Sequence, residues 1–163
     1  MYDDTMVTRR DWLVRAAAAI GAGVALAVLL PRAGSASPKP ASITVYKDPS
    51  CGCCTKWVDH LRASGFAPEV HDRGDMDALK DSLGVPSELR SCHTAVAGRY
   101  VIEGHVPAAD VKKLLASAPA NLVGLAVPGM PAGSPGMEMG ARADRYDVIE
   151  FGAKGTTRVF AHH

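Results

Sequence analysis

Three of the four cysteines in this chain lie within four consecutive residues, and no other feature constrains its fold and chemistry as strongly. The cluster reads Cys51-Gly52-Cys53-Cys54, and the remaining Cys92 stands beside a histidine. Thiols this close together can bind a soft metal, cycle between thiol and disulfide, or do both in turn. The rest of the chain must therefore supply a scaffold and a compartment that suit these sulfur atoms.

The N-terminal residues follow the three-part pattern of an export signal. Arg9 and Arg10 precede an apolar run from Ala16 to Leu30, and small residues follow at 33–36. This order is typical of a signal peptide, and the arginine pair resembles a twin-arginine signal. A run of about 15 residues is short for a membrane-spanning helix, which needs roughly 20 strongly apolar residues. We therefore favour a cleaved signal over an uncleaved membrane anchor.

The predicted organisation is a signal at 1–36, a linker at 37–41 and a single domain at 42–163. The signal contains four of the 18 Lys and Arg and three of the 17 Asp and Glu, so 14 of each kind remain. This balance gives no reason to expect nucleic acid as a partner. We expect an exported protein without membrane association after cleavage, in an oxidising compartment where only a metal, a partner or burial keeps thiols reduced.

Hydrophobic periodicity predicts an α/β domain that carries the cysteines between its first strand and first helix. Strands are expected at 43–46, 66–71, 94–97, 100–102, 146–151 and 156–160, and helices at 54–65, 75–83 and 108–117. Pro68 makes the second strand an edge candidate. This order is thioredoxin-like, with a central mixed sheet and flanking helices. In that fold the loop before the third strand faces the cysteine motif, so Cys92 and His93 should lie against it.

The segment 124–140 is dense in Gly and Pro, which predicts a long loop and excludes a helix or central strand. It contains Pro-Gly-Met twice, at 128–130 and 135–137. Long loops in compact domains are usually functional. Met130 and Met137 are therefore candidate thioether ligands for a soft metal, with core filling or a flexible surface as the alternative.

Several kinds of site are compatible with the cysteines. Cys51 and Cys54 form a C-x-x-C pair at a helix start, which supports a reversible disulfide, but Cys53 would compete for it. Zinc needs four tetrahedral ligands, for which adjacent Cys53 and Cys54 are poorly spaced. Cu(I) accepts two or three soft ligands and lets sulfur bridge neighbouring ions, so adjacent thiolates suit it. We therefore favour copper. The alternative to a metal or redox site is that the four cysteines form two structural disulfides.

The histidines differ in how well they could extend such a site. His93 directly follows Cys92, and His105 lies at a strand-to-helix turn that could face the cysteines. His60, on the first helix, and His71, at the end of a polar strand, are expected to be solvated. We therefore take His93 and His105 as candidate ligands.

The chain resembles the DUF411 family, whose best-known members are the CopG-type periplasmic copper-resistance proteins. The resemblance spans 42–161 in four ordered blocks, which are Cys51-Gly52-Cys53-Cys54-x-x-Trp57, 84–95, 102–108 and 124–138. It implies a thioredoxin-like fold, a periplasmic setting and a thiolate-bridged copper site. The implied metal ligands are Cys51, Cys53, Cys54 and Cys92, with His93, His105, Met130 and Met137 as further candidates.

The predicted function is copper resistance, in which a multi-cysteine, multinuclear site holds Cu(I) for sequestration or for transfer to a copper exporter or periplasmic copper carrier. The alternative is an enzyme of another class, a thioredoxin-like thiol oxidoreductase. In that case Cys51 and Cys54 would be catalytic and would act on copper or on partner disulfides.

Overall fold

The computed structural model describes residues 41–138, 140 and 142–163. The predicted signal peptide and most of the predicted linker therefore lie outside the described residues. No helix in the described part of the chain is long and apolar enough to cross a membrane.

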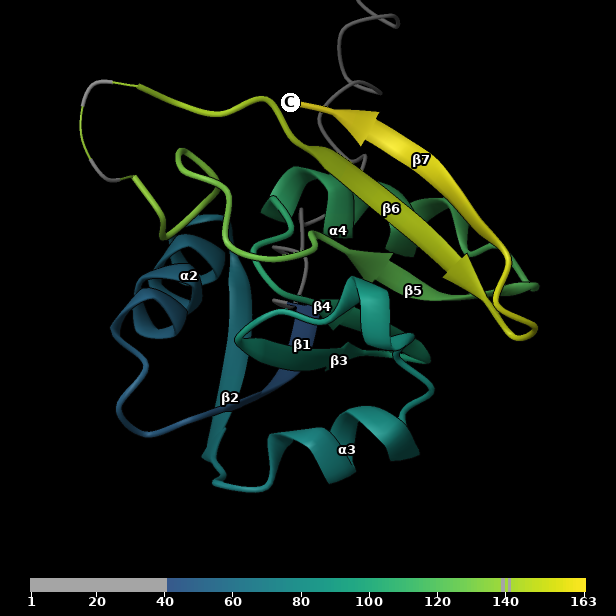
Figure 1. Ribbon diagram of the computed structural model, residues 1–163, viewed down its shortest axis with the longest axis horizontal. Coiled ribbons are helices and arrows are strands. Elements are labelled where there is room, and N and C mark those ends of the chain that lie inside the picture. Colours follow the sequence, from purple (N-terminus) through teal and green to yellow (C-terminus); the bar gives the residue numbers. More distant parts are fainter. Residues whose placement is uncertain (1–40, 139, 141) are drawn as a thin grey trace, which may run out of the picture. The chain divides into compact units, whose positions relative to one another are not determined.

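The described residues form a mixed α/β fold on one seven-stranded sheet (Figure 1). Its strands are β1 (Ala41–Lys47), β2 (Phe66–Asp72), β3 (His93–Ala97), β4 (Tyr100–Glu103), β5 (Leu122–Ala126), β6 (Asp147–Gly152) and β7 (Thr157–His162). Its helices are α2 (Gly52–Ala63), α3 (Met76–Ser82) and α4 (Ala108–Ser117), with a short 3-10 helix at Ser87–Leu89.

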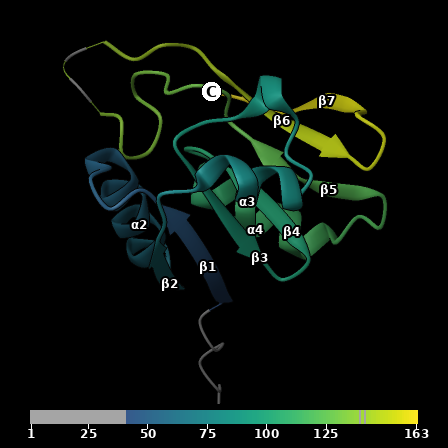
Figure 2. The ribbon, with the colours of Figure 1, turned by 60° about the horizontal axis from the view of Figure 1, so that its bottom comes forward.

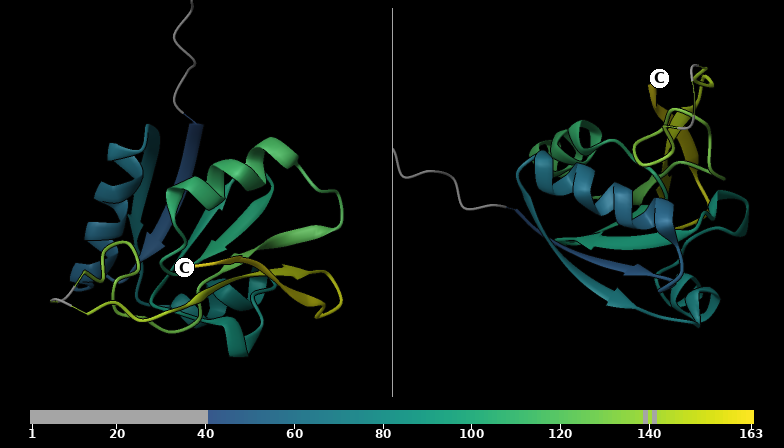
Figure 3. Two further views of the ribbon diagram at one scale, coloured as in Figure 1. Left: turned by 90° about the horizontal axis from the view of Figure 1, so that it is seen from above. Right: turned by 90° about the vertical axis from the view of Figure 1, so that its left-hand side faces the viewer.

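The sheet has the order β2-β1-β3-β4-β5-β6-β7. The pairs β1 with β2 and β4 with β5 are parallel, and the other neighbours are antiparallel. As Pro68 predicted, β2 is an edge strand, a position that tolerates the missing backbone N–H. Helices α2 and α4 lie on one face of the sheet and α3 on the other (Figure 3). Figure 2 shows α3 lying across β3 and β4.

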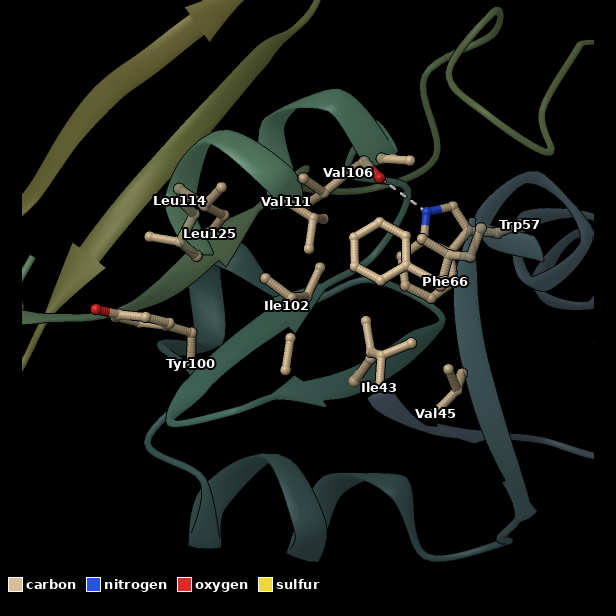
Figure 4. Packing of buried hydrophobic residues seen from close by; sticks show 14 of the residues in the cluster. Ile43, Val45, Trp57, Phe66, Tyr100, Ile102, Val106, Val111, Leu114 and Leu125 are labelled. Atoms are coloured by element: carbon tan, nitrogen blue, oxygen red, sulfur yellow. Dashed lines mark hydrogen bonds between the residues drawn. The ribbon is translucent and has the colours of Figure 1, made fainter. Parts of the chain in front are cut away.

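The main apolar core fills the space between the sheet and the pair α2 and α4 (Figure 4). Trp57 and Leu61 from α2 and Val111 and Leu114 from α4 belong to this core, and all four side chains are fully buried. The indole Nε1–H of Trp57 donates to the carbonyl of Val106 at 2.9 Å, so the middle of α2 is tied to the segment that leads into α4. A second core cluster, which includes Val85, Leu89, Val101, Ala126 and Phe151, lies apart from it.

The expectation that 124–140 contains no central strand is wrong. Residues Leu122–Ala126 form β5, which lies between β4 and β6 inside the sheet. Gly124 fits inside this strand because the neighbouring atoms leave no room for a side chain. A Cβ there would come 2.0 Å from the carbonyl oxygen of Val101 and 2.8 Å from Phe151. The glycine therefore allows close packing, and the irregular segment begins only at Val127.

Candidate metal centre

The cysteine cluster lies where the chain turns from β1 into α2. The Cys51 N–H donates to the carbonyl of Asp48 at 3.1 Å, which closes the turn before the helix. Cys51 is the N-cap of α2, and its Sγ accepts the backbone N–H of Cys54 at 3.4 Å. No acidic residue neutralises the first turn. The positive end of the helix dipole therefore lies beside the sulfur atoms of this turn.

All four cysteine sulfurs gather in one place, within 4.8 Å of one another. A disulfide joins Cys51 and Cys54, whose Cα atoms are 5.4 Å apart. The Sγ of Cys53 lies 3.5 Å from that of Cys51 and 3.9 Å from that of Cys92. Cys53 and Cys92 are free thiols, so the structure does not form the two structural disulfides that an even cysteine count allowed.

Cys92 also belongs to a second group, together with His93 and His105. Its Sγ lies 3.4 Å from Nδ1 of His93 and 3.1 Å from Nε2 of His105. The Nδ1–H of His105 donates to the carbonyl of Pro135 at 2.8 Å. This hydrogen bond fixes the tautomer of a neutral His105, so the lone pair on Nε2 faces Cys92.

His93 is fully buried between two aromatic rings, with centroid distances of 4.4 Å to Trp57 and 4.9 Å to His105. Burial lowers the pKa of His93 well below its usual value, and the nearby His105 and Lys80 lower it further. Its Nε2 has no hydrogen-bond partner among the described residues. A buried, unpaired polar atom costs about 1–3 kcal/mol. The nitrogen beside the Cys92 thiol is Nδ1, and a neutral His93 that carries its proton on Nε2 presents the lone pair of Nδ1 there, which suits a metal ligand.

The environment of Cys92 favours the protonated thiol. Burial and the neighbouring Cys53 together raise the pKa of Cys92 to about 12. A metal at this sulfur must therefore displace a proton, which makes binding at Cys92 depend on pH.

The irregular segment after β5 packs its backbone against the cluster. Gly136 has a φ of +87° and lies so close to α2 that a Cβ would come 2.8 Å from the carbonyl oxygen of Cys53 and from the backbone N of Trp57. The side chain of Met137 is half-buried, whereas that of Met130 is 53% exposed. The segment thus lies beside the cysteines, and ligand roles for its two methionines stay a prediction.

Sequence reasoning missed a set of polar residues buried behind the centre. Lys80, Thr94 and Glu103 are at most 3% exposed and bond to one another. The only signal in the sequence is Glu103 itself, a carboxylate at the end of an apolar strand.

Sequence reasoning was also wrong about His60, which is half-buried and whose Nε2 accepts the N–H of Ala108 at 3.0 Å. His71 is exposed, as expected.

The chain is similar to one known protein family and to two solved structures. The family described as "Protein of unknown function, DUF411" matches residues 89–137, which include Cys92, His93 and His105. Two solved structures, named "Copper resistance protein copG- Form 2" and "Copper resistance protein copG- Form 1", are 50% and 51% identical to the chain. Each match has a TM-score of 0.72 and covers 76% of this chain and 98% of the other. No curated protein matches. The chain therefore belongs to the DUF411 family, as a CopG-type member.

Proposed function

We propose that this protein binds copper in copper resistance and holds Cu(I) at the centre formed by its four cysteines with His93 and His105. The observation that carries the proposal is the sharing of Cys92 between a four-sulfur group and a Cys-His-His group. A ligand common to two groups can bridge two ions. The names of the two similar solved structures support copper as the metal.

The donor set fits Cu(I) better than zinc. Cys53 and Cys54 are adjacent in sequence and cannot easily occupy two corners of one tetrahedron. Cu(I) accepts two or three soft ligands, so each of these sulfurs can serve a different ion. The neutral imidazoles of His93 and His105 add nitrogen donors, and Met130 and Met137 are proposed as further thioether donors. We therefore propose a site for more than one copper ion.

Copper binding at this centre depends on the redox state of Cys51 and Cys54. While these two cysteines form a disulfide, their sulfurs are not thiolates. Only Cys53 and Cys92 can then supply thiolate ligands. Opening the disulfide requires two electrons and two protons and yields two thiols. Each thiol releases its proton when it binds a metal. Reduction therefore raises the number of available sulfur ligands from two to four.

The wider setting is part of the same proposal. We assign the fold as thioredoxin-like, with the segment before β3 facing the cysteines. Residues 1–36 are proposed as a twin-arginine signal that exports the protein to the periplasm. The proposed role there is sequestration of Cu(I), or its transfer to a copper exporter or periplasmic copper carrier.

The disulfide between Cys51 and Cys54 favours a second candidate function, a thiol oxidoreductase. In the reduced protein the two thiols would give one electron to each of two Cu(II) ions. This would produce two Cu(I) ions, one disulfide and two released protons. A partner disulfide could be reduced instead by exchange, with the partner leaving as a dithiol.

Metal analysis with thiol counting on protein isolated from the periplasm without oxygen tests the proposal. We expect more than one copper per chain and thiols that become titratable only after copper is removed. One zinc per chain, or no metal together with no free thiols, would contradict it. Reduction of insulin disulfides by the metal-free protein would favour the second candidate.

A further inference from the structure

A buried carboxylate lies behind the candidate centre and accepts three hydrogen bonds. Glu103, at the end of β4, is fully buried. Its Oε1 accepts from Nζ of Lys80 at 2.5 Å and from the backbone N–H of Ser91 at 2.6 Å. Its Oε2 accepts from the hydroxyl of Thr94 at 2.6 Å, and Lys80 also donates to that hydroxyl at 2.9 Å. One side chain thus connects α3, the segment before β3, and β3 itself.

Stability alone gives little reason for these charges to be buried. Removing two charges from water costs several kcal/mol for each ion, and apolar residues of similar size often serve as well or better. The carboxylate offsets this cost by accepting from Lys80, Ser91 and Thr94 together. Such a network defines one geometry, because each lost partner leaves a buried polar group unpaired.

The geometry that the network defines is that of the proposed copper ligands. Ser91 and Thr94 are the residues on either side of Cys92 and His93, so Glu103 holds this short segment at both ends. The backbone N–H of Gly104 donates to the carbonyl of His93 at 2.9 Å. Gly104 connects Glu103 to His105, and a Cβ on Gly104 would come 2.6 Å from Cβ of Ser91.

A further bond extends the connection to the irregular segment after β5. The hydroxyl of Ser91 donates to the carbonyl of Gly129, which directly precedes Met130. The backbone N–H of Val127 donates to the carbonyl of Glu103 at 3.0 Å. The segment that begins at Val127 is therefore attached both to β4 and to the residue before Cys92.

We propose that Glu103 is a positioning residue whose buried carboxylate, paired with Lys80, fixes Cys92, His93 and His105 in the arrangement that receives copper. The inference rests on the proposed function for the identity of the ligand. The positions of the thiol and imidazoles are set by the protein before any ion binds.

The first test needs no copper. Reduced protein is alkylated with iodoacetamide, and peptide mass spectrometry follows the reaction at Cys92 alone. In Glu103→Gln, a freed segment should expose Cys92 and raise its alkylation rate about tenfold, the scale expected for losing hydrogen bonds to a charged group. The matched control is Tyr100→Phe, which removes another hydrogen bond of β4, the one from the Tyr100 hydroxyl to the carbonyl of Pro119, and should leave the rate unchanged.

A second variant separates positioning from folding, since Glu103→Gln leaves Lys80 buried without its counter-charge. In the double variant Lys80→Met with Glu103→Leu, both charges are gone and an apolar pair replaces them, so the fold should persist. Ser91 and Thr94 still lose their acceptor, and Cys92 should again react faster. A Cys92 rate equal to wild type in both folded variants would overturn the inference.

The second test uses copper. Cu(I) affinity is measured by competition with a chromophoric Cu(I) chelator, and the thiolate-to-copper absorption is recorded. Glu103→Gln should weaken binding about tenfold and alter the spectrum, the scale seen for residues that orient metal ligands. In a Cys92→Ser background the same substitution should add a smaller loss, because only His93 and His105 remain to be positioned. A full additional loss in that background would overturn the inference.

The two tests keep this inference separate from the proposed function. A wild-type protein that binds no Cu(I) contradicts the function, while the alkylation rates still decide the role of Glu103. A wild-type protein that binds Cu(I), with affinity, spectrum and Cys92 reactivity all unchanged by Glu103→Gln, keeps the function and overturns the positioning role.

Discussion

The two halves of the candidate centre are built differently. Cys51, Cys53 and Cys54 come from one turn of chain at the start of α2, and all but Cys54 are half-buried. His93 and His105 come from β3 and from the turn between β4 and α4, and both are fully buried. The sulfur half depends on a local sequence, whereas the imidazole half depends on strands that meet only after folding.

This difference separates two properties that a copper site needs. A local, half-buried sulfur cluster outside the main core can exchange metal or change its redox state without disturbing that core. Two buried histidines, with rings packed on Trp57 and on each other, keep one geometry because core packing leaves them no alternative. Cys92 belongs to both halves and connects them. Substitutions can therefore be chosen that act on one half, on the other, or on the connection.

The largest effect is expected from Trp57→Ala, because Trp57 packs α2, whose start carries the sulfur half, against His93 of the imidazole half. Trp57 is fully buried, contacts the ring of His93 and donates to the carbonyl of Val106. Its truncation should lower the free energy of unfolding by about 3–5 kcal/mol, the usual cost of such a cavity. Urea unfolding of the metal-free protein measures this loss of unfolding free energy. A loss equal to that of exposed Val159→Ala would contradict the view that Trp57 joins the two halves.

Cys92→Ser should have the next largest effect, on copper rather than on stability. Because both ligand groups contain Cys92, its loss should lower both the copper stoichiometry and the Cu(I) affinity, the latter by about 100-fold or more, since even residues outside the ligand shell change affinity 10–100-fold. Cu(I) titration against a competing chelator provides the measurement. Unchanged stoichiometry would show that the halves do not share this ligand.

Cys53→Ser should affect the sulfur half alone. Cys53 contacts Cys51 and Cys92 but belongs only to the four-sulfur group. We expect fewer coppers per chain, with the loss smaller than in Cys92→Ser, and an unchanged ability of Cys51 and Cys54 to form their disulfide. Metal analysis and an insulin-reduction assay distinguish the outcomes. Wild-type copper content in both Cys53→Ser and Cys92→Ser would contradict a multi-cysteine copper site.

The same contrast explains what the sequence could predict. The sulfur half was predictable because its residues are neighbours, and the closeness of Cys92 followed once strand order was inferred. The pairing of Lys80 with Glu103 was not, because the two residues are 23 positions apart and nothing local shows that a helix lysine turns inward. Gly124 misled for a related reason, since only the carbonyl of Val101 explains why a glycine belongs inside a strand.

His60 is not a candidate ligand, but it contacts the start of α4, which follows the turn that carries His105. Its substitution should have the smallest effect. The N–H of Ala108, at the start of α4, donates to Nε2 of His60, so this bond requires the neutral ring. Burial lowers the pKa of His60, partly opposed by the charge of Glu138. Protons therefore bind more readily to His60 in the unfolded chain. The contribution of neutral His60 to stability is complete above pH 6.5, the ordinary pKa of histidine, and is lost as the pH falls below that value.

Comparison of wild type with His60→Ala isolates this contribution, because His93 and His105 are shifted in the same direction and remain in both proteins. At pH 7.5 the substitution should cost about 1 kcal/mol of unfolding free energy, the net value of one hydrogen bond. At pH 5 the difference should shrink, because protonation has already weakened the bond in wild type. His71→Ala, at an exposed position, should show no such dependence. Urea unfolding at both pH values measures it, and a difference that grows in acid would contradict a neutral His60 at the start of α4.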